Sequence, residues 1–167
     1  MHYSPILAPV VALVAWTLIV QIWLYATRFP AMKRAGISLK GRVGSRGAQL
    51  DGVIDDKAQW KAHNYNHLLE QPTIFYAILL TMALISMGDP INQRLVWDYA
   101  GLRMNHPLNQ YLAWGYAGLR IVHSLIQCTI NIVRYRFAAF SLASLCLLAL
   151  TFHTGARILH DCLVIID

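Results

Sequence analysis

Apolar residues dominate four long stretches of the chain, and polar residues gather between them. The stretches predict helices at about residues 5–27, 55–87, 110–132 and 137–160. Each is long enough for the roughly 20 residues that a helix needs to cross the hydrocarbon core of a bilayer. The segments of about ten alternating residues that are typical of membrane β-barrels do not occur. The pattern predicts an all-α integral membrane protein, a four-transmembrane-helix bundle forming one domain over residues 1–167.

The connecting segments have the composition of loops. Residues 28–56 are rich in Gly, Ser and charge, and residues 88–109 contain two prolines near their ends and a central run, 91–102, that suggests a short interfacial helix. A short link is expected at 133–136. The first apolar run lacks a basic leader and a small-residue cleavage site, so we interpret it as a retained span and not as a signal peptide.

The composition supports a lipid environment. Hydrophobic residues make up 57% of the chain and charged residues 13%, whereas soluble domains have about 25% charged residues. The net charge of +6 is unevenly spread. No Lys or Arg precedes Arg28, and the first connecting segment then holds Arg28, Lys33, Arg34, Lys40, Arg42 and Arg46.

This charge distribution predicts an orientation. By the positive-inside rule the first and third loops face the cytoplasm and both termini lie on the opposite side, in what we expect to be a bacterial inner membrane. Basic loops beside membrane spans need no nucleic-acid partner, and we expect none. An anionic-lipid patch in the first loop remains an alternative. The three cysteines are predicted to be small buried hydrophobic residues, because all lie in apolar surroundings and none forms a CxxC pair.

Two helices carry polar side chains at helical spacing. On the third predicted span they are Arg120, His123, Ser124, Gln127, Asn131 and Arg134, and on the second they are His63, Asn66, His67 and Glu70. Charged residues inside a membrane are costly and mark functional sites. One interpretation is a structural ion pair between Glu70 and Arg120. The length of both rows favours a polar cavity for an anionic ligand. A metal site at His63 and His67 with Glu70 or His123 is a further alternative, although no HExxH motif is present.

Two segments resemble the MAPEG family, the membrane-associated proteins of eicosanoid and glutathione metabolism. They are KAHNYNHLLEQPTIFY (Lys61–Tyr76) and LRIVHSLIQCTINIVRYRF (Leu119–Phe137). In the first, Glu70 and Pro72 match the family's pattern. In the second, Arg120 and His123 match Arg-x-x-His, and Arg134 and Arg136 match the basic cluster. The combination His-Ser-Leu-Ile-x-Cys-Thr resembles a bacterial branch.

The resemblance implies a homotrimer that binds glutathione as a cosubstrate between subunits, near the cytoplasmic face. Arg136 would then stabilise the thiolate as the catalytic residue. The glutathione-binding residues would be Lys61, Asn64, Asn66, His67, Glu70, Arg120, His123, Gln127 and Arg134, with no metal. The chain departs from the family pattern in having His67 at an Asn position, lysines where arginines are common, and Gln127 at a Tyr position.

The leading functional hypothesis is a glutathione transferase- or peroxidase-like membrane enzyme that conjugates or reduces lipophilic electrophiles or lipid hydroperoxides. The alternative is a non-catalytic membrane protein that binds lipid or a partner membrane protein. A small transporter or channel is a third hypothesis, because charged stripes also line permeation paths.

Overall fold

A computed structural model of the chain describes residues 4–38, 40–41, 43–44, 46–88 and 106–164. These residues form two short 3₁₀ helices and four long α-helices: η1 (Pro5–Leu7), α1 (Ala8–Arg34), η2 (Gly47–Leu50), α2 (Asp56–Gly88), α4 (Pro107–Thr129) and α5 (Val133–Val164). No strand occurs among them. The all-α prediction is confirmed. The interfacial helix expected at 91–102 lies outside the described residues.

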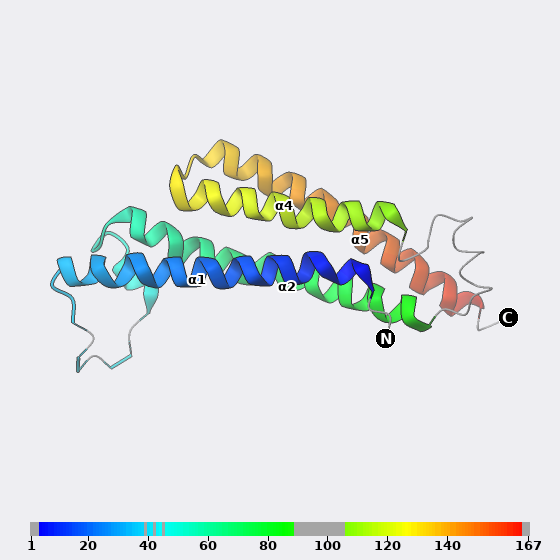
Figure 1. The fold of residues 1–167 in the computed structure, drawn as a ribbon, viewed down its shortest axis with the longest axis horizontal. Helices are drawn as coiled ribbons and strands as arrows, with labels where there is room; N and C mark the ends of the chain where they lie inside the picture. The colour runs from blue at the N-terminus through cyan, green and yellow to red at the C-terminus, as the bar shows by residue number, and fades with distance from the viewer. Residues whose placement is uncertain (1–3, 39, 42, 45, 89–105, 165–167) are drawn as a thin grey trace.

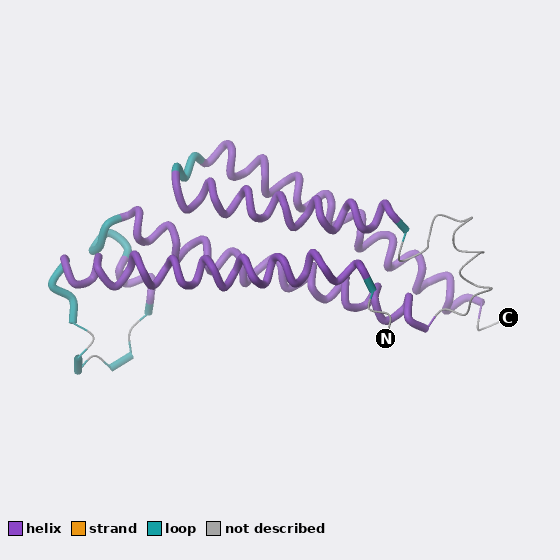
Figure 2. The backbone as a smooth tube through the Cα atoms, in the orientation of Figure 1, coloured by secondary structure: helices purple, strands orange, loops and turns teal. Residues whose placement is uncertain are grey.

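The helices are arranged as two long hairpins (Figure 1). α1 packs along α2, and α4 packs along α5. The segment that joins α1 to α2 and the turn that joins α4 to α5 lie toward the same end of the bundle, while α1 starts and α5 finishes toward the other end (Figure 2). The two basic connections expected on one side of a membrane therefore share one end of the protein.

Three helices are long and apolar enough to cross a membrane: Pro5–Arg34, Asp56–Ser86 and Val133–Leu163. The third predicted span corresponds to α4, which has 23 residues and so has the length of a span. Its hydropathy is lowered by its polar row, and for this reason α4 is not among the three. The length of α4 and its position in the bundle still match the third predicted helix, at about residues 110–132.

α1 continues two turns beyond the expected end near residue 27. A helix of 27 residues is about 40 Å long, so it exceeds the hydrocarbon core and its charged last turn can stand in the headgroup region. It ends in a Schellman motif at Gly36, which has a φ of +69°. The Ile37 N–H donates to the Met32 carbonyl at 3.0 Å, and the Gly36 N–H donates to the Lys33 carbonyl at 3.2 Å.

The link expected at residues 133–136 is in fact the first turn of α5, and the connection is residues 130–132. The reason is Asn131, which adopts a φ of 51° and ends α4 by donating its N–H to the Ile126 carbonyl at 2.7 Å. Asn is among the few residues that tolerate this left-handed conformation. Arg134 and Arg136 therefore lie on a helix instead of in a loop.

Two cores hold the bundle together. The larger one joins all four long helices through residues such as Leu13, Phe75, Tyr116 and Leu150. The smaller one lies under the first connecting segment and contains Ala31, Met32, Leu50, Ile54 and Ala58. Leu50 and Ile54 thus anchor a segment whose composition predicts an ordinary surface loop.

Candidate functional site

α4 presents polar side chains to the interior of the bundle. Arg120 and Gln127 are 0% and 1% exposed, and His123 is 5% exposed. Except for Thr129, its exposed side chains are instead apolar or aromatic, and they include Leu108, Tyr111, Trp114, Val122 and Leu125. This polarity is the reverse of a helix on the surface of a soluble protein. It is typical of intramembrane polar residues, which face the bundle interior and mark functional positions.

Arg120 is a buried charge with spare hydrogen-bonding capacity. Its Nη2 donates to the His67 carbonyl at 2.6 Å, and its guanidinium lies 5.6 Å from the ring centroid of Phe140. Its Nε and Nη1 have no hydrogen-bond partner within the described parts of the chain. A buried guanidinium with two unpaired donors is costly unless an acceptor reaches it. Arg120 is therefore suited to bind an anionic or strongly accepting group.

The alternative ion pair between Glu70 and Arg120 is not formed. The Glu70 carboxylate instead lies 3.1 Å from Nδ1 of His67, and the Glu70 side chain is two-thirds exposed. The ion pairs of the described residues do not include Arg120. Arg120 consequently has no ion-pair partner among the described residues.

A pocket of about 180 Å³ lies beside Arg120, between α2, α4 and the start of α5. We call it the site pocket, and it is lined by His67, His123, Val133, Arg136, Phe137 and Phe140. The His67 and His123 rings stand edge to face, with centroids 6.3 Å apart. Nδ1 of His123 has no hydrogen-bond partner among the described residues. The pocket thus combines two imidazoles and a guanidinium with an apolar wall from α5.

Arg136 is held in place by the turn before α5. Its Nη1 donates to Oδ1 of Asn131 at 2.6 Å. Arg136 also lies in the first turn of α5, where the helix dipole already supplies partial positive charge. Cations are unfavourable at this end of a helix and anions are favourable. An anionic group in the site pocket would be stabilised by both the guanidinium and the helix terminus.

Asn64 and Gln127 are fully buried in the bundle and do not line the site pocket. Nδ2 of Asn64 donates to Oγ of Ser124 at 2.6 Å and lies 3.2 Å from Sγ of Cys128. The indole of Trp16 donates to the same Ser124 hydroxyl at 2.9 Å. This cluster joins α1, α2 and α4. Gln127 is buried with its Oε1 unpaired in the described structure, and it does not line the site pocket.

The predicted site residues are therefore only partly brought together. His67, His123 and Arg136 meet in the site pocket, with Arg120 beside it. Asn66, Glu70 and Arg134 are exposed, and none of them lines this pocket. Lys61 is buried on another face of α2, because six positions of an α-helix turn it about 120° away from His67.

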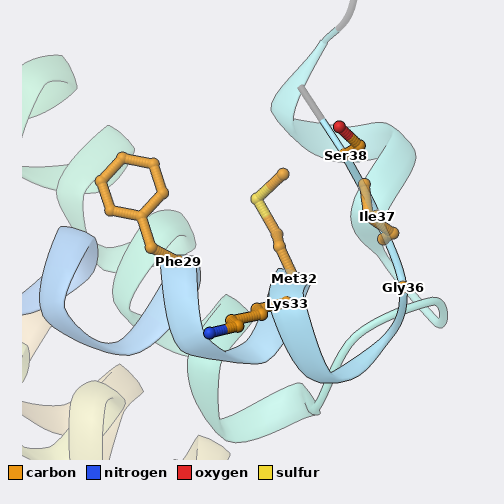
Figure 3. A pocket seen from close by; sticks show the side chains of 6 residues that line it. All are labelled: Phe29, Met32, Lys33, Gly36, Ile37 and Ser38. Atoms are coloured by element: carbon orange, nitrogen blue, oxygen red, sulfur yellow. The ribbon is translucent and has the colours of Figure 1, made fainter. Parts of the chain in front are cut away.

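Lys61 lines a separate pocket of about 320 Å³ between α1 and α2, which we call the basic pocket. Its other lining residues are Ala26, Thr27, Pro30, Arg34, Asp55, Lys57 and Ala58. A third hollow, of about 420 Å³, lies between the last turns of α1 and the segment that follows it. Figure 3 shows Phe29 and Met32 on one side of this hollow and Ile37 and Ser38 on the segment after α1, so its lining is mixed and contains one cation, Lys33.

The histidines of α2 each bind a carboxylate. Nε2 of His63 lies 3.0 Å from the Asp51 carboxylate, whereas His67 pairs with Glu70. In the described part of the chain, no three His, Cys, Asp or Glu side chains come together as a metal site. The Gln59 amide donates to Asp51, and this bond, assisted by His63, holds the pKa of Asp51 below its ordinary 3.8.

The apolar wall of the site pocket and the exposure of one cysteine were not predicted from the sequence. Phe140 follows Arg136 by one turn, so helical spacing could have placed both on one face. Nothing in the sequence shows that this face of α5 meets His123. Cys128 is buried as predicted and Cys146 is half-buried, but Cys162 is exposed.

Comparison with known proteins gives one match. The profile of the MAPEG family matches residues 6–110 and 104–156, which together make up most of the chain. No curated protein and no solved structure matches the chain significantly.

Proposed function

Because the chain belongs to the MAPEG family, we propose that it is a membrane enzyme that conjugates or reduces lipophilic electrophiles, including lipid hydroperoxides, with glutathione as cosubstrate. The family includes glutathione-dependent transferases and peroxidases as well as non-catalytic members. One observation carries the proposal. Arg136, His67 and His123 line a single pocket beside Arg120, whose two unpaired N–H donors are buried.

The site pocket suits the thiolate of glutathione. A free thiol has a pKa of about 8.5, and nearby cations or a helix N-terminus lower it. Arg136 and the first turn of α5 supply both effects. In a conjugation, the sulfur forms the new C–S bond and its electron pair displaces a leaving group or enters a conjugated system that then takes up a proton. In a reduction, the thiolate cleaves the O–O bond of a hydroperoxide and the leaving oxygen takes up a proton from water, which gives an alcohol and a sulfenic acid. A second glutathione thiol then converts the sulfenic acid to disulfide and water.

The remaining groups of glutathione have partners nearby. The tripeptide carries two carboxylates, and guanidinium forks bind carboxylates well. Nε and Nη1 of Arg120, which have no partner among the described residues, are N–H donors for one of these carboxylates. A volume of about 180 Å³ is smaller than the roughly 300–1,000 Å³ of typical ligand pockets. We therefore expect one chain to enclose the cysteinyl part, and a neighbouring copy in a homotrimer to complete the site, with Asn66, Glu70 and Arg134 taking part.

The electrophile reaches this pocket from the bilayer. Phe137 is 69% exposed and Val133 66%, and both line the site pocket together with Phe140. An apolar wall open toward lipid admits a substrate that partitions into the membrane. Glutathione, which is charged, arrives from the aqueous side. We place the end that carries the first and third connections on the cytoplasmic side of a bacterial inner membrane, in line with the basic residues of these connections.

A non-catalytic member that binds lipid or a partner membrane protein is the second candidate. It is favoured by Gln127, which replaces a family tyrosine and does not line the site pocket. In that case the site pocket would bind no thiol.

The two candidates are separated by the ultraviolet difference spectrum of the thiolate, recorded while purified protein is titrated with glutathione near neutral pH. A saturable thiolate signal in the wild type that is lost in Arg136→Ala is the expected result. Lys33→Ala, which removes one charge outside both the site pocket and the basic pocket, is the control. If millimolar glutathione gives no signal in the wild type, the enzyme proposal is wrong and the non-catalytic candidate replaces it.

A further inference from the structure

The basic pocket contains a buried ammonium group that the proposed glutathione chemistry does not use. Lys61 is 8% exposed. Its Nζ donates to the Lys57 carbonyl at 2.6 Å and lies 5.4 Å from the ring centroid of Trp23. The ion pairs of the described residues do not include Lys61. A buried charge without a counter-charge is costly, so the environment of Lys61 calls for an anion.

The rest of the lining has the same sign. Arg34 and Lys57 are exposed at the rim, and Asp55 is the one carboxylate among the eight lining residues. Three cationic side chains therefore face one anionic side chain. Lysine binds phosphate as a compact point charge, and basic pockets between membrane helices are typical sites for the headgroups of anionic lipids.

The position of the pocket favours a lipid over a free anion. Trp23 lies against Lys61 of this pocket, and Tyr25 and Phe29, whose rings stack with centroids 5.6 Å apart, follow Trp23 within two turns of α1. Aromatic residues at a helix end mark the membrane–water interface. The basic pocket therefore lies at the depth of the lipid headgroups.

A row of exposed apolar residues leads from the pocket into the bilayer. Pro30 and Ala26 line the pocket and are exposed. Ile22 and Leu18 continue the row at intervals of four residues, and they are 69% and 55% exposed. Residues four apart lie on one face of a helix. A lipid whose phosphate occupies the pocket can lay its acyl chains along this row.

We propose that the basic pocket between α1 and α2 binds the phosphate of an anionic phospholipid, with Lys61 as the buried contact and Arg34 and Lys57 at the rim. The acyl chains lie against α1 below the pocket. The lipid is thus a specific ligand at a place separate from the site pocket.

The test is native mass spectrometry of the full-length, detergent-solubilised protein mixed with equal amounts of phosphatidylglycerol and phosphatidylcholine. The wild type is expected to retain phosphatidylglycerol at least about fivefold better, because a Lys near a membrane surface gives about this factor. In Lys61→Met the preference should fall below about twofold. Lys33→Met, which removes an equal charge at the same end of α1, should keep it.

Three results would overturn the proposal. The first is an unchanged preference in Lys61→Met. The second is an equal loss in Lys33→Met, which would indicate unspecific charge. The third is displacement of the lipid by an equal concentration of glycerol phosphate, which would indicate a site for a free phosphate. If Lys61→Met does not fold, the double variant Arg34→Gln/Lys57→Gln, which changes only rim side chains, takes its place. The same loss of lipid preference is expected of it, and an unchanged preference would overturn the proposal. This experiment contains no glutathione. The lipid preference can therefore be absent while the thiolate signal is found, and the thiolate signal can be absent while the lipid preference is found.

Discussion

The site pocket and the basic pocket both lie toward the end of the bundle that carries the connecting segments, but they hold their positive charge differently. In and beside the site pocket the guanidinium groups are fixed: Arg120 is bonded to the His67 carbonyl, and Arg136 to Asn131. Of the three cations in the basic pocket, Arg34 and Lys57 are exposed and only Lys61 is buried. Fixed, directional donors can select the shape of a small ligand and lower a thiol pKa. Exposed cations over an apolar helix face supply charge for a larger anion with acyl chains.

The largest effect is expected for Arg120→Met, which removes the buried guanidinium group beside the site pocket. A hydrogen bond to a charged group contributes about 1.5–3 kcal/mol, so glutathione affinity should fall by about ten- to a hundredfold. Thermal unfolding without glutathione should occur at an equal or higher temperature, because a costly buried charge has been replaced by an apolar side chain. A large loss of thermal stability would instead make Arg120 a structural residue and weaken the contrast between the pockets.

The next effect is expected for Arg136→Ala. The thiol pKa of bound glutathione should rise by about one unit toward its free value of about 8.5, which is about a tenfold loss of thiolate near neutral pH. The pH profile of the thiolate absorbance measures this shift. Arg136→Lys keeps the charge without the planar fork, so the thiol pKa in this variant should lie between the values for the wild type and Arg136→Ala. An unchanged profile in Arg136→Ala would show that this residue does not face the thiol.

Asn131 tests whether the fixed orientation of Arg136 matters. Asn131→Gly tolerates the φ of 51° but removes the acceptor of Arg136, so the fraction of thiolate should fall about threefold. Asn131→Asp keeps an acceptor and adds a negative charge beside the guanidinium, so it should raise the thiol pKa. Both are read from the same spectrum. If neither variant differs from the wild type, Arg136 needs no positioning and its charge alone suffices.

The smallest effect concerns Asp51, in the segment that leads to Asp55 of the basic pocket. Its pKa is lowered by the Gln59 hydrogen bond, so its contribution to stability is present above pH 3.8 and is lost as the pH falls through the lowered value. Hydrogen exchange of residues 47–54, corrected for intrinsic rates, should therefore lose protection at the acidic end. Asp51→Asn should remove this pH dependence. Exchange that keeps its pH dependence in the variant would assign it to another group.

Much of the bundle could be predicted from sequence because the hydrocarbon core fixes the length of apolar helices. The helix ends could not be predicted in this way. Gly36 and Asn131 end α1 and α4 through left-handed backbone conformations, and hydropathy contains no signal for them. Lys33 and Arg34 are charged and helical at once, since that part of α1 reaches beyond the core.

The candidate site was predictable in part for the same reason. Spacing placed His123 and Arg120 on one face of α4, and they do lie at one site. The meeting of this face with Arg136 and Phe140 depends on the turn at 130–132 and on the packing of α5, which a single sequence does not give. The separation of Lys61 from His67 was available from helical geometry. We nevertheless expected both residues in one site, because the family resemblance implied a single glutathione site that contains them.

The most direct test of two separate anion sites measures both ligands in the same two variants. Arg136→Ala and Arg34→Gln/Lys57→Gln are each assayed for the glutathione thiolate signal and for retention of phosphatidylglycerol over phosphatidylcholine. We predict that Arg136→Ala loses the thiolate signal and keeps the lipid preference, and that the double variant does the reverse. If either variant loses both signals, the two pockets serve one ligand and the account is contradicted.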